Sequence, residues 1–342
     1  MPASARGSLR SSSSPRSSRR RGEGSARSTG VRRRPLRWRR TNGIGEEAGV
    51  LLAGKNAVVT GSTRGLGRAY LVGLAEAGAN VVVNGRNPDQ CEALAREIND
   101  GPGGNAVTFP ESIASWDAGE RIVDTCIEAF GSIDILVNNA GIVRDRMIFN
   151  MTEEEYDEVL ATNLKGHFAC TRFASRHMRA QGSGRIINMT ADSGLSGYTG
   201  NSNYSATKGA IATITRGWAL ELMKYGITVN AISPSAETEM TATIPDNIDA
   251  IKGSRGLTHG GRAATRTGTT DECAPIVTYL CSDEAQEITG QIFGIGADRL
   301  SLYSHPDPKI RIFHEGGWTV DLIRERVPAL MVPALESIEL RV

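Results

Sequence analysis

The 342-residue chain has no stretch that approaches the ~20 consecutive apolar residues needed to cross a bilayer. It also lacks a CxxC pair, because its five cysteines are scattered along the sequence. Their spacing predicts neither a structural zinc site nor a disulfide framework, and it indicates reduced thiols. These absences predict a cytoplasmic protein that binds no metal and does not enter a membrane. Hydrophobic residues still make up 39% of the chain, enough for the core of one large domain.

Acidic residues are almost absent from the first 40 positions, which hold 13 arginines and a single acid, Glu23. This segment carries +12, which leaves −11 for residues 41–342, so the globular part offers no electrostatic reason to bind nucleic acid. Residues 1–49 have few aliphatic side chains to bury and are predicted to form a disordered, dispensable arm. Its composition leaves open a transit peptide, a tail for nucleic acid or an acidic partner, or translation upstream of the true start.

From Gly54 onward, short β-rich runs alternate with helical stretches. Strands are expected at residues 57–60, 80–83, 106–109, 133–137, 185–189, 227–230 and, as the last, 291–294. Helices are expected at residues 65–78, 88–99, 117–130, 152–180, 202–225 and 270–282. Near-continuous apolar strands are typical of a parallel sheet that is covered on both faces. The pattern predicts an α/β fold with a single Rossmann-type, doubly wound parallel sheet over residues 50–300.

Two further segments lie outside this alternating pattern. Residues 301–342 are expected to form a C-terminal extension. Residues 241–269 contain Gly, Thr and Arg in no clear period, and they are a candidate lid over the site.

A glycine-rich turn, residues 60–67 (Thr-Gly-Ser-Thr-Arg-Gly-Leu-Gly), follows the first predicted strand and opens the first predicted helix. Glycines let the backbone approach a pyrophosphate, and the N-terminus of the helix favours the same negative charge. This strand–turn–helix context predicts a nucleotide site, whereas a glycine turn alone would be weak evidence. The candidate cofactor-binding residues of the turn are Gly61, Arg64, Gly65, Leu66 and Gly67.

The end of the second predicted strand bears on the choice of cofactor. An acid there holds the ribose hydroxyls of NAD, whereas an arginine accommodates the phosphate of NADP. The chain reads Asn84-Gly85-Arg86, with no acid. Arg86, helped by Arg64, is therefore expected to pair with the phosphate of NADP, although NAD and a merely solvated arginine stay open.

Tyr204 and Lys208 are four residues apart in a predicted helix, which places them on one face. A phenol is a poor base near neutral pH, and a neighbouring ammonium is expected to lower its pKa. The pair would then exchange a proton with a substrate alcohol or carbonyl. Tyr and Lys at this spacing are common in proteins, so the pair needs other motifs beside it.

Those motifs are Asn138-Asn139-Ala140-Gly141 after the fourth predicted strand, and Asn163 in the following helix. Together with the glycine turn and the Tyr204–Lys208 pair, they resemble the short-chain dehydrogenase/reductase family over residues 52–298. The resemblance implies that Tyr204 donates or accepts the proton, that Lys208 lowers its pKa and holds the ribose, and that Asn163 anchors a relay water. It also implies that Asn139 lines the cofactor and that Thr238 contacts it.

A narrower resemblance involves residues 139–146, 232–236 with 240–241, and 293–297. These segments are similar to the (3R)-hydroxyacyl-CoA dehydrogenase domain of peroxisomal multifunctional enzymes and to bacterial 3-oxoacyl thioester reductases. The resemblance implies a small-molecule ketone or alcohol substrate, namely a 3-hydroxyacyl or 3-oxoacyl thioester. It also implies a homo-oligomer, a tetramer or a dimer, built on the helices that contain Asn163 and Tyr204.

One position departs from the family pattern. The family places a serine thirteen residues before the tyrosine, and that position here is Ala191. Thr190 or Ser193 could supply the hydroxyl after a small shift of the loop. A catalytically weak or inactive nucleotide-binding protein, acting as a sensor or partner subunit, is therefore the alternative to an active oxidoreductase. A nucleic-acid-associated protein that uses the Arg-rich arm is a more remote alternative.

Overall fold

The computed structural model describes residues 50–237 and 268–335, and a single sheet runs through this domain. The strands are β1 (Asn56–Val59), β2 (Asn80–Asn84), β3 (Ala106–Phe109), β4 (Ile135–Asn138), β5 (Gly184–Met189), β6 (Ile227–Pro234), β7 (Ile292–Gly296) and β8 (Arg299–Leu302). Their order is β3-β2-β1-β4-β5-β6-β7-β8, with β8 antiparallel to β7 and the others parallel. The predicted Rossmann-type doubly wound sheet is confirmed.

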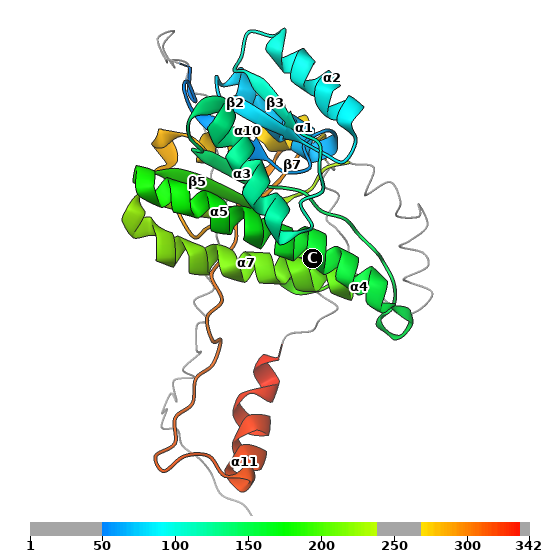
Figure 1. Ribbon diagram of the computed structural model, residues 1–342. Coiled ribbons are helices and arrows are strands. Elements are labelled where there is room, and N and C mark those ends of the chain that lie inside the picture. Colours follow the sequence, from blue (N-terminus) through cyan, green and yellow to red (C-terminus); the bar gives the residue numbers. More distant parts are fainter. Residues whose placement is uncertain (1–49, 238–267, 336–342) are drawn as a thin grey trace, which may run out of the picture. The chain divides into compact units, whose positions relative to one another are not determined.

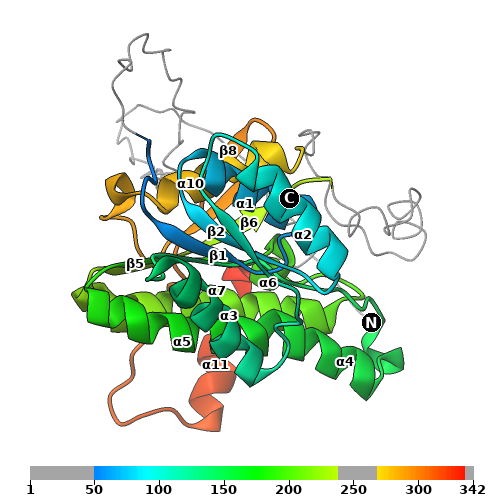
Figure 2. The same cartoon turned by 45° about the horizontal axis from the view of Figure 1, so that its top comes forward.

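Helices cover both faces of this sheet, as right-handed crossovers require. The helices are α1 (Gly65–Glu76), α2 (Pro88–Asn99), α3 (Trp116–Phe130), α4 (Glu153–Leu160), α5 (Gly166–Gln181), α6 (Asp192–Ser196), α7 (Ser202–Leu222), α10 (Ala274–Leu280) and α11 (Val320–Leu330). One core cluster joins the sheet to α1, α2 and α10, and a second joins it to α3, α5 and α7 (Figures 1 and 2). Val59 belongs to the first cluster and Val58 to the second, because neighbouring strand residues point to opposite faces.

The ends of the helices follow signals in the local sequence. Asn87 caps α2 by accepting a hydrogen bond from the backbone of Gln90 (3.1 Å), and Pro88 occupies the first turn. Thr152 and Glu155 form a capping box at the start of α4, in which each side chain bonds the backbone N–H of the other residue. These caps satisfy backbone N–H groups that the helices leave without partners.

Two expectations about the elements were wrong. The helix predicted over residues 152–180 is interrupted by a π-helical turn at Ala161–Lys165, which separates α4 from α5. The strand predicted at 291–294 is not the last, because β8 follows it and pairs with β7 from Phe293 to Gly296. Neither feature has a strong sequence signal, since a π turn keeps helical composition and β8 has only four residues.

The Arg-rich arm at residues 1–49, Thr238 and residues 241–267 of the candidate lid lie outside the described residues. Within the described ranges, no helix is long and apolar enough to cross a membrane. The same ranges contain no group of three His, Cys, Asp or Glu residues that could hold a metal ion.

Candidate active site

The glycine turn joins β1 to α1 at the carboxyl ends of the strands. From β1 the chain continues to β2 and β3 on one side, and the later strands begin with β4 on the other side of β1, so the strand order reverses here. Open α/β sheets bind ligands at this switch point. Gly61 and Gly65 have φ angles of +64° and +56°, a region that side chains with a Cβ rarely adopt. A Cβ added at Gly67 would lie 2.2 Å from the carbonyl oxygen of Gly61, so α1 packs directly on the turn.

The N-terminus of α1 fits a dinucleotide pyrophosphate. No side chain caps this helix at Arg64, and its first turn contains no acidic residue. The N–H groups of that turn and the positive end of the helix dipole therefore favour an anion. The Leu66 side chain packs partly against the core cluster that joins α1 to the sheet, so its contribution to this anion site is its backbone N–H in the first turn.

Two buried or half-buried asparagines hold the glycine turn in place. The Asn139 side chain donates hydrogen bonds to the carbonyls of Thr60 (2.9 Å) and Gly61 (3.1 Å). The Asn84 side chain accepts a hydrogen bond from the backbone of Gly61 (2.9 Å) and donates to the carbonyl of Phe109 (2.9 Å). The turn is thus bonded to the ends of β2, β3 and β4, and Asn139 lies beside it as the sequence predicted.

The position after β2 at which an NAD-binding acid is expected is occupied by Gly85, and a side chain there would have to displace Thr63. A Cβ added at Gly85 would lie 2.6 Å from Cγ2 and 2.9 Å from Oγ1 of Thr63. Thr63 therefore fills the space that a longer side chain would need. Arg86 is exposed next to this position, and Arg64 is exposed in the glycine turn.

Tyr204 and Lys208 lie one turn apart on α7, as predicted. The Lys208 side chain is almost fully buried, and its Nζ donates a hydrogen bond to the carbonyl of Met189 (2.7 Å). The same nitrogen lies 5.4 Å from the centroid of the Tyr204 ring. The ammonium therefore faces the ring of Tyr204 and the end of β5.

The lowering of the Tyr204 pKa by Lys208 stays a prediction, because other groups dominate the surroundings of this phenol in the described structure. Burial raises the pKa of Tyr204 to about 12, and the negative charge of Asp145 adds to the shift. Burial also lowers the pKa of Lys208 to about 7.

Asn163 is fully buried in the π-helical turn between α4 and α5. Its side-chain oxygen accepts from the backbone N–H of Ile142 (2.8 Å), and its nitrogen donates to the carbonyl of Ile142 (3.0 Å). That nitrogen also lies 3.5 Å from Oγ1 of Thr207, which donates to the carbonyl of Tyr204 (2.7 Å). Asn163 thus connects the segment after β4 with the tyrosine turn of α7.

Ala191, at the family's serine position, directly precedes α6 as its N-cap residue. The Thr190 hydroxyl donates to the carbonyl of Lys208 (2.7 Å) and is buried. Thr190 therefore has a fixed structural bond and cannot supply the missing hydroxyl without losing it. Ser193 lies in the first turn of α6 and is half-buried. Of the two candidates, it is the one whose hydroxyl could replace that of the family's serine.

Sequence reasoning missed His167, which is fully buried in α5. Its Nε2 lies 2.8 Å from the carbonyl oxygen of Ala140, whereas its Nδ1 is buried with no partner among the described residues. Burial lowers the pKa of His167 to about 3, and the charge of Lys208 lowers it further. The sequence held one signal that could have pointed to His167. It follows Asn163 by four residues, a spacing that predicts a shared helix face.

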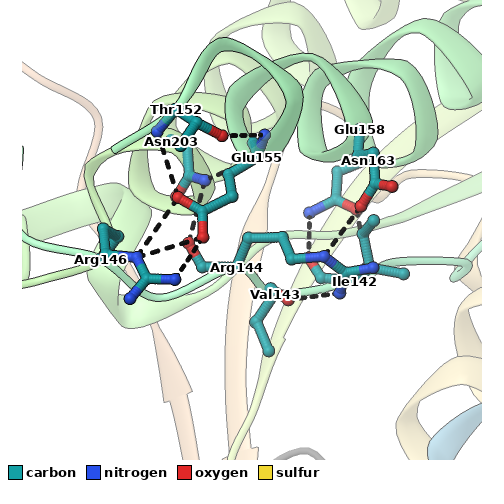
Figure 3. A network of polar contacts seen from close by, with 9 residues as sticks. All are labelled: Ile142, Val143, Arg144, Arg146, Thr152, Glu155, Glu158, Asn163 and Asn203. Atoms are coloured by element: carbon teal, nitrogen blue, oxygen red, sulfur yellow. Dashed lines mark hydrogen bonds and ion pairs between the residues drawn. The ribbon is translucent and has the colours of Figure 1, made fainter. Parts of the chain in front are cut away.

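The segment after β4 is tied to α4 by two ion pairs (Figure 3). Arg146 contacts Glu155 at 2.6 Å, and Arg144 contacts Glu158 at 2.8 Å. The Asn203 side chain, next to the catalytic candidate on α7, donates to the carbonyls of Arg144 (3.1 Å) and Glu155 (3.2 Å). Such a network fixes the first turn of α7 against the loop that carries Asp145.

Comparison with known sequences supports this arrangement. Residues 55–249 match the family of short chain dehydrogenases. The chain is 36% identical over 286 residues to hydroxyacyl-CoA dehydrogenase ChsB1 of Mycobacterium tuberculosis, covering 78% of this chain and 84% of the relative. It is 39% identical over 240 residues to 3-oxoacyl-[acyl-carrier-protein] reductase FabG of Staphylococcus epidermidis, covering 69% and 95%.

Solved structures give the same result. A short chain dehydrogenase from Mycobacterium avium is similar with a TM-score of 0.68 and 35% identity, over 80% of this chain and 93% of that one. A putative gluconate dehydrogenase from Agrobacterium tumefaciens is similar with a TM-score of 0.64 and 32% identity, over 72% and 96%. The chain therefore belongs to the short-chain dehydrogenase/reductase family, and it is an oxidoreductase that acts on CH–OH groups with a nicotinamide dinucleotide cofactor.

Proposed function

We propose that this protein interconverts a 3-oxoacyl thioester and the corresponding 3-hydroxyacyl thioester with NADP(H). One observation carries the proposal. The glycine turn, Asn163 and the Tyr204–Lys208 pair all lie at the carboxyl ends of the central strands β1, β4 and β5. The relatives named above are a hydroxyacyl-CoA dehydrogenase and an acyl-carrier-protein reductase, which supports a thioester as the substrate.

Tyr204 is the proposed proton donor in the direction of reduction. Its raised pKa keeps the phenol protonated at neutral pH, so its hydroxyl can hydrogen-bond the carbonyl oxygen of the substrate. The proton passes from Tyr204 to that oxygen as the carbonyl carbon accepts a hydride. The nicotinamide supplies this hydride when the cofactor is bound.

Lys208 and Asn163 are the proposed partners of Tyr204 in returning the proton. A pKa of about 7 allows Lys208 to change its protonation state near neutral pH, which suits a relay group. Asn163 is held by both polar atoms of Ile142, so it fixes the backbone next to the site. The residues proposed to hold the dinucleotide at the glycine turn are Gly61, Arg64, Gly65, Leu66, Gly67 and Asn139.

NADP is the proposed cofactor because the end of β2 combines three features. Position 85 lacks an acid, Thr63 occupies the space beside Gly85, and Arg86 is exposed next to it. An arginine pairs well with a phosphate, whereas an NAD site needs a carboxylate for the ribose hydroxyls. Arg86→Ala should therefore lower the preference for NADPH over NADH.

The second candidate is a nucleotide-binding member of the family with weak or no turnover. Ala191 favours it, because the site lacks the expected hydroxyl and Thr190 is bonded elsewhere. Losing one such transition-state hydrogen bond can cost about 10²-fold in rate. Binding of NADPH without reduction of any ketone tested would support this candidate.

A homo-oligomer in the cytoplasm is proposed as the working form. Phe168 of α5 and Leu220 of α7 are 41% and 75% exposed, which leaves apolar side chains at the surface of the two helices. Burial of such residues is a usual driving force for association. Light scattering after size exclusion should give a dimer or a tetramer.

The deciding test follows absorbance at 340 nm with purified protein, acetoacetyl-CoA, and either NADPH or NADH. Oxidation of NADPH that requires Tyr204 would support the proposal, and the rate ratio of the two cofactors would test Arg86. Failure of the wild-type protein with acetoacetyl-CoA and a panel of ketones, despite NADPH binding, would favour the second candidate.

A further inference from the structure

A carboxylate outside the described catalytic group collects hydrogen bonds from two distant parts of the chain. Oδ1 of Asp192, the first residue of α6, accepts a hydrogen bond from the Ser233 hydroxyl (2.6 Å). The Tyr303 hydroxyl donates to the same oxygen. Ser233 lies near the end of β6, and Tyr303 directly follows β8. Three elements therefore meet at the residue next to Ala191.

The ring of Tyr303 is seated by packing as well as by its hydroxyl. It packs against a small buried cluster formed by Ala212, Ala231 and Ile292, as Leu195 of α6 also does. A Cβ added at Gly294 would lie 3.1 Å from Cε2 of this ring, so glycine at that strand position leaves room for it. The backbone N–H of Tyr303 also donates to the carbonyl of Ile292 (2.9 Å). The side chain is thus held in one orientation at the edge of β7.

The loop that carries Asp192 is in contact with the catalytic lysine at three places. The Lys208 Nζ donates to Met189, and the Thr190 hydroxyl donates to the carbonyl of Lys208, each at 2.7 Å. A Cβ added at Gly194 would lie 2.4 Å from the carbonyl carbon of Lys208. Any movement of residues 189–194 would therefore move the surroundings of Lys208.

We propose that Tyr303 is a positioning residue, which holds the loop at residues 189–194 against Lys208 through the carboxylate of Asp192. The proposal rests on the oxidoreductase activity proposed above for Tyr204 and Lys208. Tyr303 itself does not need to touch the substrate. Its role explains why the chain continues past β7 with an antiparallel strand: β8 delivers this side chain to the catalytic loop.

The chemistry of the pair suits a permanent anchor. Burial and the neighbouring Asp192 raise the pKa of Tyr303 to about 12, so the phenol stays a hydrogen-bond donor over the working pH range. The Asp192 carboxylate accepts the hydrogen bond of Tyr303, and hydrogen bonds to a carboxylate are stronger than those between neutral groups. Ser233 provides the second bond from near the carboxyl end of β6.

Tyr303→Phe tests the proposal, because it removes the hydroxyl and keeps the ring. We expect kcat for acetoacetyl-CoA reduction to fall about ten-fold, since small misplacements of a catalytic group are costly. The KM for NADPH and the melting temperature should stay near the wild-type values. Tyr279→Phe is the matched control, because it removes an exposed tyrosine hydroxyl on α10.

Asp192→Ala tests the same bond from its other end without touching the ring. The double variant Tyr303→Phe/Asp192→Ala should be no slower than Asp192→Ala, because both changes break one interaction. Hydrogen–deuterium exchange of residues 190–196 should be faster in both single variants, and this measurement needs no substrate.

Wild-type kcat and wild-type exchange in both single variants would overturn the proposal. A parallel fall of kcat, NADPH affinity and melting temperature would also overturn it, since that pattern indicates a general loss of folding. If the wild-type protein reduces no ketone, the proposed substrate fails, and the exchange rates alone then decide whether Tyr303 anchors the loop.

Discussion

The cofactor side and the substrate side of the site are held together in different ways. On the cofactor side, the glycine turn is bonded by Asn84 and Asn139, which stand at the ends of central strands. On the substrate side, the loop after β5 depends on Ser233 and on Tyr303, which is 111 residues away from Asp192. Both regions depend on contacts between distant parts of the chain. The first is built from motifs that can be recognised in the sequence, whereas the bonds of Ser233 and Tyr303 to Asp192 belong to no such motif.

Tyr204→Phe would separate the two regions most strongly. It removes the proposed acid from the substrate side and leaves the glycine turn unchanged. We expect the rate of NADPH oxidation to fall about 10³-fold, which is within the range for loss of a general acid. NADPH affinity, measured by quenching of protein fluorescence, should not change. A variant that retains substantial turnover would remove Tyr204 from the proposed mechanism.

Gly67→Ala should damage the cofactor side instead. The new Cβ would stand 2.2 Å from the Gly61 carbonyl and 2.5 Å from Nδ2 of Asn139, so the turn must shift. We expect about 100-fold weaker NADPH binding, equivalent to the usual cost of overpacking.

The control for this change is Gly65→Ala. Gly65, unlike Gly67, has a positive φ angle, and a Cβ there would meet no atom within 4 Å. Its cost should be limited to backbone strain, about 1–2 kcal/mol in stability. Equal binding losses in the two variants, measured by calorimetry, would argue against steric specificity at Gly67.

His167 links the two regions, because it contacts Ala140 on the cofactor side and senses the charge of Lys208. Its folded pKa of about 3 lies below its value of about 6.5 in the unfolded chain. The unfolded state therefore binds more protons between these values, and stability falls as the pH drops from 6.5 towards 3. The loss from this residue should reach about 2 kcal/mol at pH 5.

His167→Gln keeps an amide donor for Ala140 and removes the titration. Urea unfolding at pH 7 and pH 5 should therefore show a smaller pH dependence in this variant than in the wild type. The exposed His177→Gln on the same helix is the control. An unchanged pH dependence in His167→Gln would contradict the buried, neutral state of this histidine.

Ala191→Ser changes the substrate side of the site and leaves the cofactor side as it is. A serine at the start of α6 restores the family's hydroxyl, and we expect about a ten-fold rise in kcat from one added hydrogen bond in the transition state. NADPH affinity should stay the same. If Ser193 already supplies that bond, then Ala191→Ser gives no gain and Ser193→Ala lowers kcat, which steady-state kinetics on both variants would reveal.

The sequence alone predicted the parallel sheet, its helices and the cofactor turn, because these depend on local patterns. Alternating apolar runs give β1 to β7, and the glycines of the turn are required by backbone geometry at Gly61 and Gly65. The side-by-side placement of Asn139 and this turn also followed from its position at a strand end.

Other parts could not be predicted, for physical reasons. The pKa of Tyr204 depends on burial and on Asp145, neither of which the spacing of Tyr204 and Lys208 reveals. The anchoring of Asp192 by Tyr303 depends on a strand pairing at the sheet edge. Likewise, the sequence shows that Thr190 is next to Ala191, but it does not show that the Thr190 hydroxyl already donates to the carbonyl of Lys208.

The π-helical turn at Ala161–Lys165 has a consequence for helical phase. A π turn adds one residue to a helix, and one residue corresponds to a rotation of about 100°. The side chains of α5 are therefore offset in phase from those of α4. This offset lets one nearly continuous helix pack through α4 on α7 and through α5 on α3 (Figure 1). Deleting a single residue from the turn would bring the two halves into one phase, so only one of the two packing surfaces could be kept.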